Sequence, residues 1–171
     1  MDEEWRPVVG YEGLYEVSDQ GRIRSLPRYV PLRGELVRKQ EGRIKKPTTR
    51  ASDGRVQITL WKNGERKLLY TYRLVLEAFC GPCPPNHEAC HWDDDPSNNT
   101  LENLRWGTQS DNQKDRIRNG NHNNVNKTRC PQGHEYSPEN TYINSKGSRE
   151  CRTCMRNRSR RNKTRTRSPV N

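Results

Sequence analysis

The chain has few of the apolar residues from which a large hydrophobic core is built. Valine, isoleucine, leucine and phenylalanine make up 26 of its 171 residues, and one of these is phenylalanine. A fraction below about 20% in a highly charged chain is typical of disorder. One large core is therefore excluded, and we expect small modules that are held by something besides apolar burial, for which bound metal is the usual substitute.

Long apolar runs and a secretory signal are also missing. No stretch approaches the roughly 18 apolar residues that a membrane span needs, and the segment Met1–Trp5 is acidic rather than signal-like. We therefore expect a soluble, cytoplasmic protein without membrane contact. In a reducing compartment, its six cysteines favour metal binding over disulfides.

Negative charge is scarce toward the C-terminus. The whole chain has a formal net charge of +11, and residues 130–171 contain 10 basic and 3 acidic residues. Residues 152–171 contain eight arginines and lysines and no acidic residue. This excess indicates a polyanionic partner, for which nucleic acid is the commonest candidate. The alternative is a solvated tail that only aids solubility.

Four residues near the C-terminus have the spacing of a zinc site. Cys130 and His134 stand four apart, and Cys151 and Cys154 form a C-x-x-C pair after a gap of 16 residues. Each pair fits a tight turn, and two such turns present four ligands tetrahedrally to one Zn²⁺. We predict a closed, structural zinc site with a short hairpin between the pairs. The alternative is four unrelated side chains.

Local patterns predict two hairpins. Asp19-Gln20-Gly21 and Asn63-Gly64 are turn signals in which glycine supplies a positive φ. We expect strands over the flanking segments 15–18, 22–26, 56–61 and 67–72.

Two short helices are predicted. Residues 73–79 carry apolar side chains at helical spacing, and Ser110-x-x-Gln113 has the form of a capping box, which predicts a helix over 111–118. The segment 27–47 lacks periodicity, and we interpret it as loop with at most one short strand.

The segment 90–104 is too polar to be ordinary structure. His91 is expected at a strand end before a turn of Asp and Asn, Asn103 lies further along, and Asn112 falls in the first turn of the next helix. An imidazole with a few hard oxygen ligands is what metal-assisted phosphodiester cleavage needs, as a base for water and a cation at the phosphate. The alternative is a structural histidine beside a polar turn.

The same residues resemble a known family. His91, Asn103 and Asn112 match the spacing of the HNH (His-Me finger) endonucleases, in the branch of phage and intron homing enzymes, and residues 98–108 match the body of their motif. Residues 4–18 resemble the NUMOD-type module that often precedes such a nuclease. The C-terminal cysteine pattern also resembles zinc elements beside phage nucleases.

The resemblance implies an α+β fold with a β-rich N-terminal module, a ββα-metal (His-Me finger) nuclease core, a zinc-binding module and a disordered basic tail. We expect these parts in chain order: a NUMOD-type module over 1–54, the HNH nuclease over 55–119, a linker over 120–128, the zinc module over 129–156 and the Arg-rich tail over 157–171.

The resemblance also implies the roles of the site residues. His91 would be the general base that deprotonates water, and Asn103 would brace the loop and hold the imidazole. Asn112 would ligate one divalent cation, Mg²⁺ or Mn²⁺, which stabilises the phosphorane and the leaving 3′ oxygen. Products would carry 5′ phosphate and 3′ hydroxyl ends, and the setting would be a phage-infected bacterial cell.

Two positions depart from the family pattern. Cys90 stands before His91, where some relatives have a hard metal ligand, and a thiolate suits magnesium poorly. Either Cys90 contributes no ligand, or an aspartate such as Asp93 or water replaces it. Asp94 stands where relatives commonly have glycine, although Asp tolerates a left-handed turn. A competing use of Cys90 is a second zinc site with Cys80, Cys83 and His87.

Double-stranded DNA is the expected partner, with the hairpin and helix at the minor groove by resemblance. Basic residues would add phosphate contacts that raise affinity without reading sequence. These are Arg22, Arg24, Arg28, Lys45, Lys46, Arg105, Arg116, Arg156, Arg158, Arg160, Arg161, Lys163, Arg165 and Arg167.

Three hypotheses follow for function. The first is a metal-dependent DNA endonuclease, which as a monomer with one site would nick. The second is a non-catalytic, zinc-stabilised DNA-binding protein with an HNH fold, and the third is an accessory nuclease that works with a phage terminase. The intact His91 favours the first.

Overall fold

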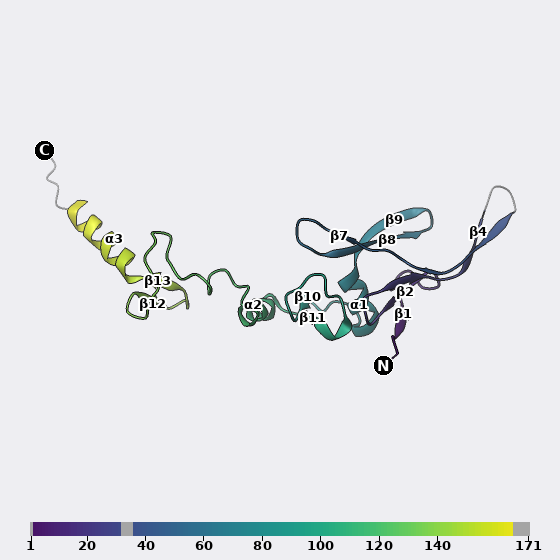
Figure 1. The fold of residues 1–171 in the computed structure, drawn as a ribbon, viewed down its shortest axis with the longest axis horizontal. Helices are drawn as coiled ribbons and strands as arrows, with labels where there is room; N and C mark the ends of the chain where they lie inside the picture. The colour runs from purple at the N-terminus through teal and green to yellow at the C-terminus, as the bar shows by residue number, and fades with distance from the viewer. Residues whose placement is uncertain (1, 32–35, 166–171) are drawn as a thin grey trace. The chain divides into compact units, whose positions relative to one another are not determined.

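The computed structural model describes residues 2–31 and 36–165, and the chain divides into two compact units, residues 1–121 and 122–171. Figure 1 shows the order of the elements along the chain. Within the described ranges, no helix has both the length and the apolar character that crossing a membrane would require.

The first unit begins with a small antiparallel sheet. Its strands are β1 (Trp5–Pro7), β2 (Tyr15–Ser18), β3 (Ile23–Ser25) and β6 (Arg43–Ile44), in that spatial order. The predicted hairpin between β2 and β3 is confirmed, and Gly21 adopts the left-handed backbone (φ 73°) that its turn requires.

The loop expected over 27–47 is wrong, because this segment contains three strands. Besides β6, it forms β4 (Arg28–Pro31) and β5 (Val37–Gln40), which pair antiparallel. Val37, Arg38 and Lys39 are all exposed, so no buried face imposes an apolar alternation on β5. Backbone pairing alone defines these strands, and the side-chain pattern therefore gives no signal for them.

A three-stranded sheet of β7 (Thr48–Thr49), β8 (Val56–Lys62) and β9 (Glu65–Tyr70) follows. Asn63 (φ 52°) and Gly64 (φ 81°) both adopt the left-handed backbone that a two-residue I′ turn requires, as predicted. Strand β9 continues directly into α1 (Thr71–Cys80), which confirms the predicted helix (Figure 1).

One hydrophobic core joins the sheets to α1. Ile58 and Leu60 point inward from alternate positions of β8 and meet Leu74, Val75 and Leu76 of the helix. The N-terminal sheet adds further buried side chains to the same core. The full set is Val8, Tyr11, Tyr15, Val17, Ile23, Ile58, Leu60, Tyr72, Leu74, Val75, Leu76 and Leu104.

A hairpin followed by a helix completes the first unit. Strands β10 (Glu88–His91) and β11 (Leu104–Gly107) pair antiparallel, the short 3₁₀ helix η1 (Leu101–Asn103) precedes β11, and α2 (Gln109–Arg118) follows it. This is the ββα arrangement that the resemblance implies.

The predicted capping box of α2 is wrong, although the helix itself is confirmed. Thr108 caps the helix: its hydroxyl accepts from the Asp111 backbone N–H (3.2 Å), and the Asp111 carboxylate accepts from the Thr108 N–H (3.2 Å). This reciprocal pair starts the helix two residues earlier than Ser110 and Gln113 would.

The second unit contains the predicted hairpin and a helix that the sequence analysis did not predict. Strands β12 (Thr141–Ile143) and β13 (Arg149–Cys151) pair, and α3 runs from Arg152 to Arg165. The prediction that the chain is disordered from residue 157 onward is therefore wrong for residues 157–165, which are helical. Arginine and lysine are good helix formers, and the first turn of α3 is anchored at Cys154. Arg167 lies outside the described residues.

Candidate active site and metal centre

The three predicted catalytic residues lie on the elements of the ββα unit. His91 ends β10, Asn103 ends η1 just before β11, and Asn112 lies in the first half of α2. Helix α2 contacts both strands. The three residues, up to 21 positions apart in the sequence, thus lie on elements that pack against one another.

A single hydrogen bond orients His91. Its Nε2 lies 3.3 Å from Asn99 Oδ1, and Asn99 Nδ2 donates to the Ser97 carbonyl (3.0 Å). Because that second bond fixes which end of the Asn99 amide is the oxygen, Nε2 must carry the hydrogen and donate it. Nδ1 then keeps its lone pair, as a proton acceptor needs.

The protein environment favours the neutral form of this imidazole. Burial lowers the pKa of His91 below its ordinary value, and the Asn99 bond and the nearby Asp93 charge oppose that shift only in part. The Tyr72 ring packs edge-on against the imidazole at a centroid distance of 5.5 Å. The ring is thus held in place and unprotonated at neutral pH.

Asn103 hydrogen-bonds the loop that follows His91. Its Nδ2 donates to Asp93 Oδ1 (2.9 Å) and to the Asn98 carbonyl (2.9 Å), and its Oδ1 accepts from the Asp93 backbone N–H (3.1 Å). Asn99, which the sequence analysis did not select, makes the contact with the imidazole that was assigned to Asn103. The only signal for it was the adjacent pair Asn98-Asn99.

The N-terminal module supports this loop. The Leu101 N–H donates to the Asp19 carbonyl at 2.7 Å, and a Cβ added at Gly21 would lie 2.8 Å from the Asn99 carbonyl oxygen. Gly21 is therefore needed both for its positive φ and for space. Asp94, where relatives commonly have glycine, adopts the left-handed backbone with φ 61°.

Cys90 is closed off from solvent. The residue is 1% exposed, and a Cβ added at Gly107 would lie 3.0 Å from its sulfur. Burial raises the pKa of the Cys90 thiol to about 11, so the sulfur stays protonated at neutral pH. A protonated, buried thiol is a poor metal ligand.

Asp93 and Asn112 are the two candidate cation ligands, and their side chains have different hydrogen-bond partners. Both carboxylate oxygens of Asp93 accept hydrogen bonds within the loop, from Asp95, Asn98 and Asn103. On α2, Asn112 Nδ2 donates to Glu88 Oε1 at 2.9 Å.

Arg105 helps to hold α2 against the hairpin. Its guanidinium pairs with the buried Asp115 of α2, to which Arg118 also donates at 2.7 Å. Both guanidinium groups stack on Trp92, at 4.8 and 3.7 Å from the ring centroid.

Two of the N-terminal basic residues that were predicted to contact DNA are ion-paired with glutamates. Arg22 pairs with Glu3, and Arg24 pairs with Glu16 at 2.6 Å. DNA contact by these residues, and by the other basic residues of the set, stays a prediction.

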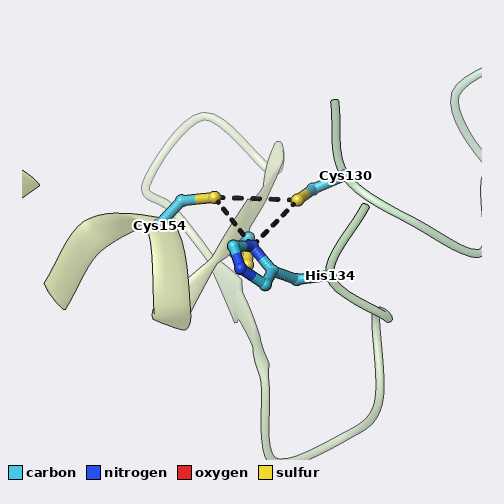
Figure 2. A group of neighbouring side chains, drawn as sticks. Cys130, His134 and Cys154 are labelled. Atoms are coloured by element: carbon cyan, nitrogen blue, oxygen red, sulfur yellow. Dashed lines mark hydrogen bonds between the residues drawn. The ribbon is translucent and has the colours of Figure 1, made fainter. Parts of the chain in front are cut away.

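The second unit brings its four predicted ligands together. The ligand atoms of Cys130, His134, Cys151 and Cys154 all lie within 4.8 Å of one another. Figure 2 shows that Cys130 and His134, from the turn that joins them, and Cys154, from α3, point toward one another. His134 Nδ1 lies 3.3 Å from Cys154 Sγ and 3.5 Å from Cys130 Sγ. The cluster is a candidate metal centre.

Backbone and side-chain contacts hold this cluster in place. Gly133 (φ 82°) closes the turn between Cys130 and His134, where the Cys130 N–H donates to the His134 carbonyl at 2.9 Å. Asn140, another residue that the sequence analysis missed, has Nδ2 3.4 Å from Cys151 Sγ and accepts from the Thr153 N–H at 3.0 Å. The turns are thus braced by a surrounding polar shell.

The competing zinc site at Cys80, Cys83, His87 and Cys90 is not assembled. Cys83 Sγ donates to the His87 carbonyl, Cys90 is buried, and Cys80 is exposed. Within residues 2–31 and 36–165, the C-terminal cluster is the group of His, Cys, Asp and Glu side chains close enough to share an ion.

Two family models match the chain. Residues 3–61 match the NUMOD4 motif, and residues 69–114 match the HNH endonuclease model. The second match contains His91, Asn99, Asn103 and Asn112.

The chain is also similar to a phage enzyme. DNA endonuclease I-HmuI of Bacillus phage SP01 is 31% identical over 117 residues, which are 68% of this chain and 59% of that protein. A solved structure of DNA binding and cleavage by the HNH homing endonuclease I-HmuI matches with a TM-score of 0.54 at 31% identity, covering 69% of this chain and 60% of that one. The chain thus spans about three fifths of the length of this relative.

Proposed function

We propose that this chain, whose residues 3–61 match the NUMOD4 motif and whose residues 69–114 match the HNH endonuclease model, is an HNH endonuclease that nicks double-stranded DNA using one divalent cation. The observation that carries the proposal is His91, whose hydrogen bond to Asn99 leaves Nδ1 as a proton acceptor. The relative I-HmuI is a DNA endonuclease, which supports DNA as the substrate.

In this proposal His91 Nδ1 accepts the proton of the attacking water. Asn99 and Tyr72 hold the ring so that its lone pair stays in one direction, and burial keeps the imidazole neutral. Proton transfer by a positioned side chain typically contributes about 10²–10⁴-fold to a rate. Asn103 acts through the loop, because its three hydrogen bonds fix the segment that carries Asn99.

The side chain of Asn112 would hold the cation through Oδ1, since its Nδ2 is engaged by Glu88. Amide and carboxylate oxygens are hard donors, and this donor set fits Mg²⁺ or Mn²⁺. When bound, such a cation neutralises charge that develops on the phosphate and on the leaving 3′ oxygen. The products would then carry 5′ phosphate and 3′ hydroxyl ends.

The second unit would bind DNA without taking part in the reaction. Four protein ligands at Cys130, His134, Cys151 and Cys154 fill a tetrahedral Zn²⁺ site and leave no position for substrate. Helix α3 then presents a basic surface to the phosphate backbone, with the exposed residues Arg156, Arg158, Arg160, Arg161 and Lys163.

The test is a plasmid assay with a matched histidine control. Supercoiled plasmid and Mg²⁺ are incubated with wild-type protein, His91→Ala and His122→Ala, the last of which alters a histidine in the second unit. We expect open circles with wild type and His122→Ala, and a loss of at least about 100-fold with His91→Ala, because the general base is removed. DNA binding, measured by mobility shift, should stay unchanged in both variants.

Cleavage that survives His91→Ala would contradict the assigned base. A plasmid that shifts in mobility but stays supercoiled, with a randomised DNA library also uncut, would favour the non-catalytic DNA-binding protein instead.

A further inference from the structure

The face of β10 that turns toward α2 presents a carboxylate beside a buried sulfur. Side chains alternate along a strand, so Glu88 and Cys90 share one face of β10 and His91 lies on the other. Cys90 is 1% exposed, whereas Glu88 is exposed. Glu88 is therefore the residue of this face whose polar atoms reach solvent.

Glu88 contacts the residue proposed above to hold the cation. Asn112 Nδ2 donates to Glu88 Oε1 at 2.9 Å, which places the two side chains of β10 and α2 together. Across the hairpin, Glu88 pairs with Gly107, which has no side chain to cover the carboxylate. The carboxylate of Glu88 and the amide of Asn112, each of which has an oxygen outside this bond, thus lie next to each other on neighbouring elements.

The other carboxylates near this position are engaged in holding the fold. Asp93 accepts hydrogen bonds on both oxygens, Asp111 completes the capping box of α2, and Asp115 is buried between Arg105 and Arg118. None of the three contacts Asn112 through its side chain among the hydrogen bonds of the described residues.

We infer that Glu88 supplies the carboxylate ligand of the catalytic cation, beside Asn112, and that Cys90 packs in the interior without touching the ion. A carboxylate and an amide oxygen are ligands that Mg²⁺ and Mn²⁺ prefer, with water and phosphate oxygens completing the coordination. This inference rests on the proposed function, since it assigns a ligand at that same site.

The test measures the affinity of the protein for a divalent cation directly, in an assay that does not depend on DNA cleavage. Full-length protein, loaded with one equivalent of Zn²⁺, is titrated with Mn²⁺ while the free ion is followed by electron paramagnetic resonance. Glu88→Gln keeps an oxygen that accepts from Asn112 Nδ2 but removes the charge, so it separates ligation from a role limited to positioning Asn112.

We expect Glu88→Gln and Asn112→Ala each to weaken Mn²⁺ binding at least about tenfold. Glu65→Gln removes an exposed carboxylate from the β8–β9 turn and serves as the matched control, which should bind like wild type. Cys90→Ala should also bind like wild type. Thermal melting of each variant confirms that the first unit is folded.

Mn²⁺ affinity that is unchanged in Glu88→Gln, or lost in a folded Cys90→Ala, would overturn the inference, as would the absence of saturable Mn²⁺ binding by wild type. Two results separate the inference from the proposed function. Wild type that nicks plasmid while Glu88→Gln binds Mn²⁺ normally overturns the inference alone. Binding that depends on Glu88 in a protein that cuts no DNA overturns the function alone.

Discussion

The two units of the chain are stabilised by different means. Among the described residues of the first unit, twelve are buried in one core, to which the N-terminal sheet, β8 and α1 all contribute. In the described part of the second unit, the buried residues are Cys130 and Cys151, while Tyr142 and Ile143 are 41% and 55% exposed. Apolar burial therefore accounts for the first unit, whereas we expect the second to depend on its Cys/His cluster.

This difference matters for function because the two candidate metal positions have opposite demands. The C-terminal cluster has four soft or borderline candidate ligands that could close around one ion, as structural zinc requires. The position at Asn112 is open and has hard oxygen donors, as a cation that must also contact a phosphate requires. A chain with a low apolar content can thus be ordered. The first unit collects its apolar side chains in one core, and the second has a candidate metal centre in place of such a core.

The largest expected effect is the loss of the second unit on removal of zinc. Structural zinc contributes about 10–16 kcal/mol in small modules, far more than residues 122–165 gain from burial. Chelation, or Cys151→Ser, should collapse the dispersed amide NMR signals of residues 130–165 and leave those of the first unit in place. Cys80→Ser, which alters an exposed cysteine, is the control. Dispersed signals of residues 130–165 that persist after chelation would show that the second unit does not need metal to stay folded.

A smaller effect, in the opposite unit, is expected from Leu60→Ala. Leu60 is 0% exposed in the core, so the substitution should lower the free energy of unfolding of the first unit by about 2–5 kcal/mol. Leu68→Ala, on the partner strand, removes a side chain that is 58% exposed and should cost little. Urea denaturation of both variants measures the free energy of unfolding of the first unit, while the signals of the second unit are followed separately. Equal losses would contradict the assigned core.

The smallest effect is expected from Asn99→Ala, which sharpens the account of the active site. Because burial lowers the pKa of His91, nicking should stay constant down to a pH below about 6.5 and then fall as the imidazole is protonated. The Asn99 bond raises that pKa, against burial and the Arg55 charge, together with Asp93 and Asp95. Its removal should shift the fall to lower pH and reduce the maximum rate by up to about tenfold.

Single-turnover nicking from pH 5 to 8 at a fixed Mg²⁺ concentration measures both quantities. A lower maximum rate with an unshifted profile would mean that Asn99 acts on the loop rather than on the imidazole.

Local signals in the sequence were sufficient where a short segment determines its own structure. The Asn63-Gly64 turn is an example, because two residues with positive φ impose one hairpin register. The C-x-x-C spacing behaves similarly, because each ligand pair needs only a tight turn. The strands β4 and β5 carried no such signal, since they are not buried against a core.

Two residues of the candidate site were invisible in the sequence for a different reason. Asn99 was one of several polar residues in a loop, and Glu88 lay three positions before His91 with no recognisable spacing to Asn112. Their contacts, to the imidazole and to the Asn112 amide, join segments 8 and 24 positions apart. Such contacts arise only when the hairpin closes and α2 packs on it.

The sequence by itself determined the kinds of chemistry present: one histidine with asparagines at HNH spacing, four zinc-type ligands and a basic C-terminus. These follow from residue type and short-range spacing, which need no knowledge of long-range packing. Only the tertiary structure decided which atom of His91 is the acceptor, which carboxylate meets Asn112 and why Cys90 is shielded. Those features depend on orientation and burial, and both are set by strand pairing and helix packing between distant segments.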